Sequence, residues 1–139
     1  MAFKVFCDAN FLLDLTLKRA AFSDVSIVMQ AAINRDIEAC TTPAILHIAS
    51  YFLAKAHNSA TAKAIIRALL NDVTIIDCSH ATAVVAVNSA ITDVEDALQY
   101  YSALAHNVDY FISGDAGLKK VALPQLPVLT AKALLPLLP

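Results

Sequence analysis

The sequence predicts a three-layer α/β/α fold: a short, mostly parallel sheet of about five strands with helices on both faces. Five short runs of apolar, β-branched or aromatic residues are separated by longer alanine-rich stretches with helical periodicity. The runs lack the polar–apolar alternation of half-exposed strands, so we expect them to be buried on both faces. Strands that alternate with helices are joined by right-handed crossovers and lie parallel in one sheet.

The predicted elements follow one another without a linker or an internal repeat. The strands are expected at residues 3–7, 37–41, 73–77, 110–113 and 127–129. The helices are expected at residues 10–18, 23–34, 43–56, 59–71, 79–90, 93–106 and 116–121, with a last helix from residue 130. Side chains that accept hydrogen bonds from free backbone N–H groups mark helix starts. The expected N-caps are Ser59, Ser79, Asp93 and Thr130.

Length and composition limit the kind of protein. A chain of 139 residues is expected to form one domain, residues 1–139, with a core that needs no disulfides. Hydrophobic residues make up 58% and charged residues 16%, which excludes a disordered chain. The net charge of −2 argues against a nucleic-acid binder that works by bulk positive charge. Contact with nucleic acid would require a local basic patch or a bound cation.

The sequence also argues against a membrane or secreted protein. Its uncharged stretches fall short of the roughly 18 consecutive apolar residues that a membrane helix needs. The N-terminal segment reaches Asp8 too early for a signal peptide. Cys7, Cys40 and Cys78 are odd in number and lie in apolar runs, so we expect buried, reduced thiols. These features favour a cytoplasmic location.

Acidic residues gather where the predicted strands end. Asp8 follows the first strand, Asp115 follows the fourth, and Asp93, Glu95 and Asp96 open the helix before the fourth strand. Ligands of open α/β sheets bind outside the carboxyl ends of the strands. If the first and fourth strands are neighbours, Asp8, Asp96 and Asp115 converge in one crevice. Mg²⁺ prefers oxygen ligands and commonly takes one or two carboxylates, so the crevice is a candidate metal site.

Each acid also has a purely structural interpretation. Asp93 is better explained as an N-cap than as a ligand, and Asp96 sits where the helix dipole favours a negative charge. Asp8 fits a capping residue, and Asp115 after Gly114 fits a turn. The combination of Asp8, Asp96 and Asp115 at strand ends and one helix mouth favours the metal site.

Three segments resemble motifs of the PIN-domain nucleases, in particular the ribonuclease toxins of bacterial toxin–antitoxin pairs. Residues 5–15 resemble the first motif, with Asp8 and Asn10 after a hydrophobic strand. Residues 94–100 resemble the third motif, and residues 110–115 resemble the fourth, in which a strand ends in Ser or Thr, any residue, then Asp. The resemblance covers nearly the whole chain.

The resemblance implies metal-dependent cleavage of RNA phosphodiester bonds. By resemblance, Asp8, Asp96 and Asp115 would hold Mg²⁺ or Mn²⁺, with Asn10 and Ser113 as supporting polar groups.

Contacts with other molecules are expected as well. Lys119 and Lys120 are candidate RNA contacts because they are the basic residues nearest the proposed site in sequence. The apolar end of the chain, residues 133–139, favours a homodimer, since exposed apolar patches mark interfaces. The resemblance adds a possible antitoxin-like protein partner.

One position departs from the family pattern. The family usually has a Glu in the helix after the second strand, whereas residues 39–54 contain no acid. The interpretation that we favour puts Ile48 at this position, beside His47, a candidate substitute ligand or proton carrier. Glu95 or Asp93 is the other candidate source of the missing charge.

The departure leaves an alternative function open, a catalytically weakened or inactive PIN-like domain that binds protein or RNA. A phosphorylated receiver domain has a similar sheet but fits less well. That class needs adjacent acids after the first strand and a lysine near the fifth strand. Here Cys7 and Ala9 flank Asp8, and residues 127–129 contain no lysine.

Overall fold

The computed structural model describes residues 2–139 and confirms the α/β class. Five strands form one sheet in the order β3–β2–β1–β4–β5, and every neighbouring pair is parallel. The strands are β1 (Lys4–Cys7), β2 (Glu38–Thr41), β3 (Val73–Ile75), β4 (Tyr110–Ile112) and β5 (Val128–Leu129). The sheet that the sequence predicts as mostly parallel is therefore parallel throughout.

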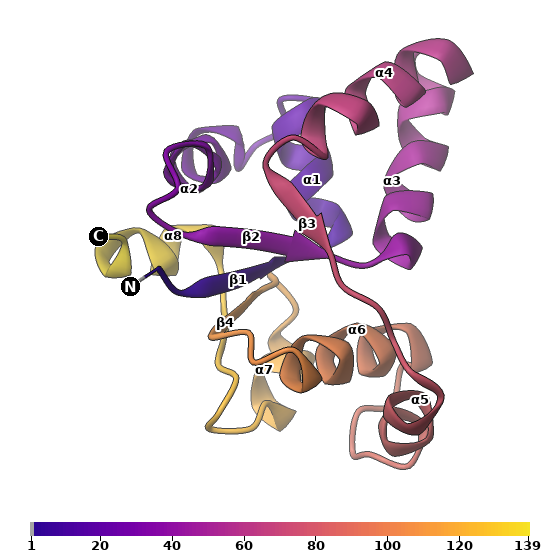
Figure 1. Ribbon diagram of the computed structural model, residues 1–139, viewed down its shortest axis with the longest axis vertical. Helices are drawn as coiled ribbons and strands as arrows, with labels where there is room; N and C mark the ends of the chain where they lie inside the picture. The colour runs from indigo at the N-terminus through magenta and orange to yellow at the C-terminus, as the bar shows by residue number, and fades with distance from the viewer. Residues whose placement is uncertain (1) are drawn as a thin grey trace.

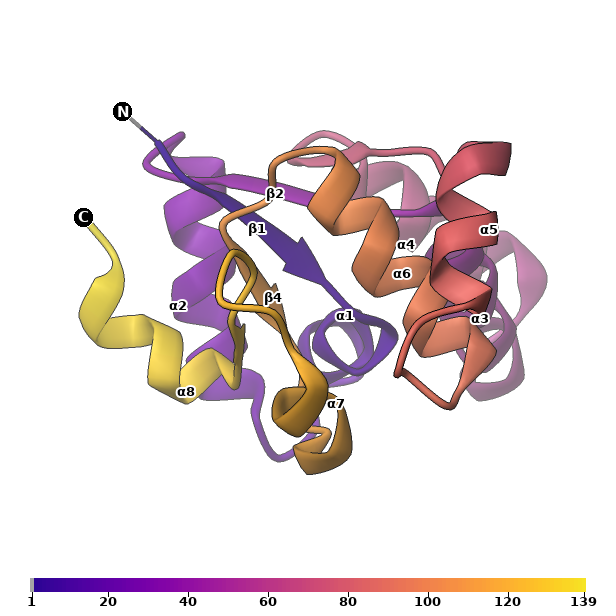
Figure 2. The same ribbon diagram turned by 90° about the horizontal axis from the view of Figure 1, so that it is seen from below.

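Eight α-helices and one 3-10 segment complete the fold within residues 2–139. They are α1 (Ala9–Thr16), α2 (Phe22–Ile33), α3 (Pro43–Ala56), α4 (Ser59–Leu69), α5 (His80–Val87), α6 (Val94–Ala105), α7 (Ala116–Val121), α8 (Ala131–Leu134) and η1 (Leu135–Leu137). Helices α1 to α4 lie on one side of the sheet and α5 to α7 on the other, where α5 packs against α6 (Figure 1). The last helix, α8, packs beside α2 (Figure 2).

Strand β1 lies in the middle of the sheet and is the best-buried strand. Val5, Phe6 and Cys7 have no exposed surface, as expected for a strand with helices on both sides. The Phe6 ring stacks on the Phe111 ring of β4 with 4.6 Å between centroids. Packing across these two strands fixes β4 against β1, although more than 100 residues separate them.

The helix caps agree with the sequence analysis at three of the four expected positions. Ser79, Asp93 and Thr130 each accept a hydrogen bond from the backbone N–H three residues on. Ser59 is the exception, because Asn58 caps α4 by accepting a hydrogen bond from Thr61 N at 2.8 Å. Both residue types favour N-caps, and the amide side chain takes that role here.

The region after β3 differs from expectation. The strand ends at Ile75 rather than at residue 77, and Cys78 is exposed, whereas Cys7 and Cys40 are buried as predicted. The reason is that β3 is an edge strand, so the chain after it leaves the sheet toward α5 and is no longer covered. None of the helices within residues 2–139 is both long and apolar enough to cross a membrane.

The apolar end of the chain also packs more closely than its sequence indicates. Leu134 is fully buried, and Leu135 and Leu138 pack against the core. Leu137 is the large apolar side chain of this segment that stays exposed. Most of the apolar surface that favours a homodimer in the sequence is therefore used within the fold.

Candidate active site

A cleft of about 400 Å³ opens where β1 and β4 end. Six of the residues predicted for the site line it: Asp8, Asn10, Glu95, Asp96, Ser113 and Asp115. Five lining residues were not predicted for the site from the sequence: Ala9, Phe111 and Gly114, and also Ile45 of α3 and Gln99 of α6, which bear on its chemistry.

The parallel pairing of β1 and β4 brings the acids together. Cys7 is the register partner of Ile112, so Asp8 and Ser113 leave the sheet side by side. Asp96 reaches the same cleft from the first turn of α6, and Asp115 reaches it from the start of α7. Three distant parts of the sequence thus supply the three carboxylates that it predicts would converge.

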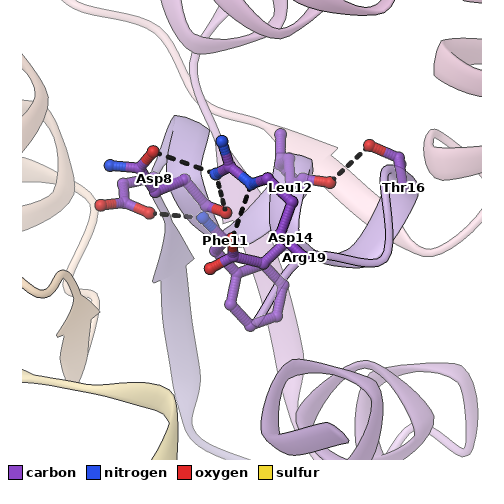
Figure 3. Close-up of polar contacts among 7 residues, drawn as sticks. Asp8, Phe11, Leu12, Asp14, Thr16 and Arg19 are labelled. Carbon is purple, nitrogen blue, oxygen red and sulfur yellow. Dashed lines mark hydrogen bonds and ion pairs between the residues drawn. The ribbon is translucent and has the colours of Figure 1, made fainter. Parts of the chain in front are cut away.

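Asp8 combines a structural and an electrostatic role. Its Oδ1 caps α1 by accepting a hydrogen bond from Phe11 N at 2.8 Å (Figure 3). Burial raises the pKa of the Asp8 carboxyl to about 6, while the hydrogen bonds from Phe11 N–H and the Ser113 hydroxyl act in the opposite direction. The negative charges of Asp14 and Asp96 raise it further. A carboxylate in this position is costly unless positive charge is brought to it.

Asp96 and Asp115 line the same cleft. Burial raises the pKa of Asp96, and the charges of Asp93, Asp115 and Glu95 add to the effect. Asp115 caps α7, where its Oδ1 accepts hydrogen bonds from Gly117 N at 2.8 Å and Leu118 N at 3.2 Å. Within residues 2–139, no Lys, Arg or His forms an ion pair with Asp8, Asp96 or Asp115.

The donor set fits a hydrated divalent cation better than a preformed cage. In the part of the chain that the structure describes, no group of three His, Cys, Asp or Glu side chains stands close enough to hold an ion together. Mg²⁺ needs only one or two carboxylates and keeps several waters. The uncompensated, partly buried charge of Asp8 and Asp96 is the feature that such an ion would relieve.

Arg19 organises one rim of the cleft. Its Nε donates to Asp14 Oδ1 at 2.8 Å (Figure 3). Its Nη2 donates to the side-chain Oδ1 of Asn10 at 3.1 Å and to the Asn10 carbonyl at 3.3 Å. Arg19 therefore fixes Asn10, which lines the cleft, without entering the cleft itself.

Neutral side chains line another part of the cleft. The Thr42 hydroxyl caps α3 by accepting from Ile45 N, and it donates to Oε1 of Gln99. Gln99 is only 5% exposed and Ile45 only 2% exposed, yet both border the cleft.

The structure places Ile45, and not Ile48, at the cleft. Thr42 is the N-cap of α3, so Ile45 is its third residue, and Ile48 lies one turn farther from the strand end. His47 is exposed and does not line the cleft. A Thr cap and a Glu at the third helical position together form a capping box. Because Thr42 is such a cap, this pattern indicates that the family's Glu would stand at position 45, where this chain has Ile.

The remaining predicted residues lie around the cleft. Asp93 caps α6 by accepting from Asp96 N at 2.9 Å, and it borders an adjoining hollow of about 200 Å³ that Asp96 and Asp115 also line. Lys119 and Lys120 are exposed on α7, whose first residue follows Asp115. A role of these two lysines in RNA binding stays a prediction.

Comparisons with known proteins agree with this architecture. A family model described as PIN domain matches residues 4–117. One similar structure is the crystal structure of VapBC2 from Rickettsia felis bound to a DNA fragment from the VapBC2 promoter. It matches with a TM-score of 0.68 and 15% sequence identity, and the match covers 91% of this chain and 98% of that chain. The structure of Mycobacterium tuberculosis VapC20, a sarcin–ricin loop cleaving toxin, matches with a TM-score of 0.64 and 12% identity over 88% of this chain and 98% of that chain. A comparison with curated protein sequences gave no significant match.

The raised pKa of Asp8 predicts how stability depends on pH without metal. The folded protein holds the Asp8 proton up to about pH 6 and the unfolded chain only to about pH 4, so stability falls as pH rises through this window. Asp8→Asn keeps a capping oxygen and removes the charge. In EDTA at pH 7, we expect a gain of at most about 3 kcal/mol, seen as a melting temperature several degrees higher.

The same measurement at pH 4 is the internal control, because the gain should shrink when Asp8 is protonated. Asp36→Asn, at an exposed acid just before β2 and so at the other end of the sheet, should leave the melting temperature unchanged. A loss of stability for Asp8→Asn at pH 7 would show that the charge of the helix cap outweighs the cost of burial.

Proposed function

The chain belongs to the PIN-domain family, and on this premise we propose that it is a divalent-metal-dependent ribonuclease of the toxin type, acting in the cytoplasm. The observation that carries the proposal is the convergence of Asp8, Asp96 and Asp115 on one cleft without a neutralising side chain. The likeness to a sarcin–ricin loop cleaving toxin supports RNA as the substrate class.

The residues that line the cleft have different roles in the proposed reaction. Asp8, Asp96 and Asp115 would hold Mg²⁺ or Mn²⁺ in part through bound waters, and the ion would supply positive charge to the phosphate and activate water at neutral pH. The Phe11 N–H and the Ser113 hydroxyl stabilise the ionised form of Asp8. Glu95 also lines the cleft and is exposed, so it can accept a proton from solvent-side water.

We predict that Mn²⁺ binds to the parent protein and not to Asp8→Asn. The carboxylate is replaced by a neutral group of the same shape, so one ligand and one negative charge are lost together. Calorimetric titration with Mn²⁺ should give heat only for the parent, and cleavage of a labelled single-stranded RNA in Mn²⁺ should be lost in the variant.

Asp36→Asn is the matched control for this titration, since it makes the same chemical change outside the cleft. It should bind Mn²⁺ and cut RNA as the parent does. Equal heats for the parent and Asp8→Asn would remove Asp8 from the metal site.

A second candidate function is a weakened or inactive domain that binds a protein or RNA. Ile45 is the observation that favours it, because a buried apolar side chain stands in the cleft at the third residue of α3. A site with one carboxylate fewer holds its ion more weakly. The two candidates differ in whether the parent cuts RNA at all.

We predict that Ile45→Glu binds Mn²⁺ more tightly and cuts RNA faster than the parent. The new carboxylate would face the cleft and could also pair with the backbone N–H of Thr42. Because Ile45 is buried, the metal-free variant should be less stable. Calorimetry, RNA cleavage and thermal melting with and without Mn²⁺ measure the three effects.

Ile48→Glu is the matched control, one helical turn away and outside the cleft. It should lose stability without a gain in Mn²⁺ affinity. A gain for Ile48→Glu and none for Ile45→Glu would reverse the assignment of the cleft-facing position.

We further propose that the protein forms a homodimer and has an antitoxin-like partner. Exposed apolar side chains support an interface: Tyr51 and Phe52 lie in ring contact on α3, and Val85 and Val87 project from α5. The Rickettsia felis structure, which contains VapBC2 and promoter DNA, supports a protein partner.

We predict a particle mass close to twice 14.8 kDa in light scattering at micromolar concentration. Phe52→Glu places a charge in the exposed apolar surface and should shift the particle toward the monomer. Lys55→Glu, at an exposed polar position of the same helix, serves as the control. A monomer at high concentration for the unmodified chain would contradict the homodimer.

A further inference from the structure

Two amide side chains line the acidic cleft, and each has its oxygen held by another residue. They are Asn10 of α1 and Gln99 of α6. An amide has one oxygen that accepts and one nitrogen that donates two hydrogen bonds. The partner of the oxygen therefore decides which group the cleft receives.

The orientation of Asn10 follows from its partner. Arg19 Nη2 lies 3.1 Å from the Asn10 side-chain oxygen, and a guanidinium can only donate. The oxygen must face Arg19, because the amide nitrogen has no hydrogen bond to make there. The ion pair of Arg19 with Asp14 at 2.8 Å keeps the guanidinium in place. Asn10 Nδ2 is thus left for the cleft.

The orientation of Gln99 follows from a hydroxyl. Thr42 Oγ1 accepts a hydrogen bond from Ile45 N, so its own proton is available for Gln99. The Thr42 hydroxyl then donates to Gln99 Oε1. Gln99 is 5% exposed, and Nε2 makes no hydrogen bond to a protein acceptor within residues 2–139. Within the described residues, the buried side-chain atoms without a partner are Ser26 Oγ and Ser102 Oγ. Gln99 Nε2 is not one of them, so it is open to the cleft and can donate to a ligand there.

The electrostatics of the cleft explain why neutral donors are needed. Four acids line it, and none of its described lining residues is a lysine or an arginine. A phosphate that enters is repelled by any carboxylate whose charge is not balanced. Amide N–H groups bind anionic oxygens and add no charge that would compete with a metal ion for the carboxylates.

We propose that Asn10 and Gln99 form a pair of neutral hydrogen-bond donors that binds the non-bridging oxygens of the substrate phosphate. This assignment rests on the proposed ribonuclease function and extends it to substrate positioning. Arg19 and Thr42 act through the pair: each holds an amide oxygen and turns the amide nitrogen toward the substrate.

Binding of adenosine 5′-monophosphate in Mg²⁺, measured by calorimetry, tests the pair without relying on cleavage. Gln99→Met keeps the length of the side chain and removes its donors, so we expect roughly tenfold weaker binding. Gln99→Glu keeps the acceptor for Thr42 and replaces the donor by a charge, so it should bind more weakly still. Asn10→Asp makes the same exchange on α1 and should behave alike.

Three further variants separate orientation from packing. Thr42→Val removes the hydroxyl and should weaken nucleotide binding, whereas Thr42→Ser keeps it and should bind as the parent does. Gln30→Glu makes the same change of charge at an exposed position of α2, outside the cleft, and should have no effect on nucleotide binding. Thermal melting of each variant identifies any that fail to fold. If Gln99→Glu fails to fold, Gln99→Met provides the test of the donor.

The outcomes distinguish this proposal from the ribonuclease itself. With a short RNA, loss of a binding contact should raise KM in Gln99→Met more than it lowers kcat. Unchanged nucleotide affinity and KM in Gln99→Met, with cleavage intact in the parent, would overturn the donor pair and leave the nuclease standing. Weaker nucleotide binding in a protein that cuts no RNA would support the pair and reject the nuclease. A parent that does not bind the nucleotide also overturns the pair.

Discussion

The pairing of β1 with β2 on one side and β4 on the other is the constraint on which the site depends. Two interactions hold β4 against β1: the stacked rings of Phe6 and Phe111, and a hydrogen bond of 2.8 Å from Lys4 N to the Asp109 carboxylate. Because the strands are parallel, their carboxyl ends meet at one edge, where ligands of such sheets bind. A shift of β4 by one residue would turn its side chains to the opposite faces and separate Asp115 from Asp8.

The acids of the cleft are at once structural and chemical groups. Asp8, Asp93 and Asp115 each accept backbone hydrogen bonds at a helix start, which the structural interpretation of the sequence expects for Asp8 and Asp93, whereas it gives Asp115 as a turn residue. A carboxylate has two oxygens, and the capping bonds of Asp8 and Asp115 use Oδ1 alone. Capping thus fixes the direction of the side chain and leaves the second oxygen free of backbone hydrogen bonds. The two interpretations that compete in the sequence are compatible in the fold.

The sequence predicts the strands and the acids at their ends well, because both are local patterns, whereas the convergence of the acids also needs β4 to pair with β1. Buried strands are continuous apolar runs, and acids at strand ends stand out in a chain with few charges. Gln99 has no such signal, since its role depends on Thr42, which is 57 residues away. Ile45 is missed for a different reason: an apolar side chain does not stand out as a site residue, although the Thr42 cap three residues earlier marks its position. Cys78 is misjudged because an apolar run does not reveal that its strand lies at the edge.

The placement of positive charge completes this picture. Arg19 is close enough to hold Asn10, yet its guanidinium is paired with Asp14 outside the cleft. An arginine inside would neutralise the carboxylates directly and lower the pKa of Asp8 toward its ordinary value. The site would then attract a divalent cation less strongly, because its charge would already be balanced. The guanidinium of Arg19 stays outside, and Asn10 and Gln99 present amide hydrogens. The cleft therefore remains negative and still has donors for a phosphate.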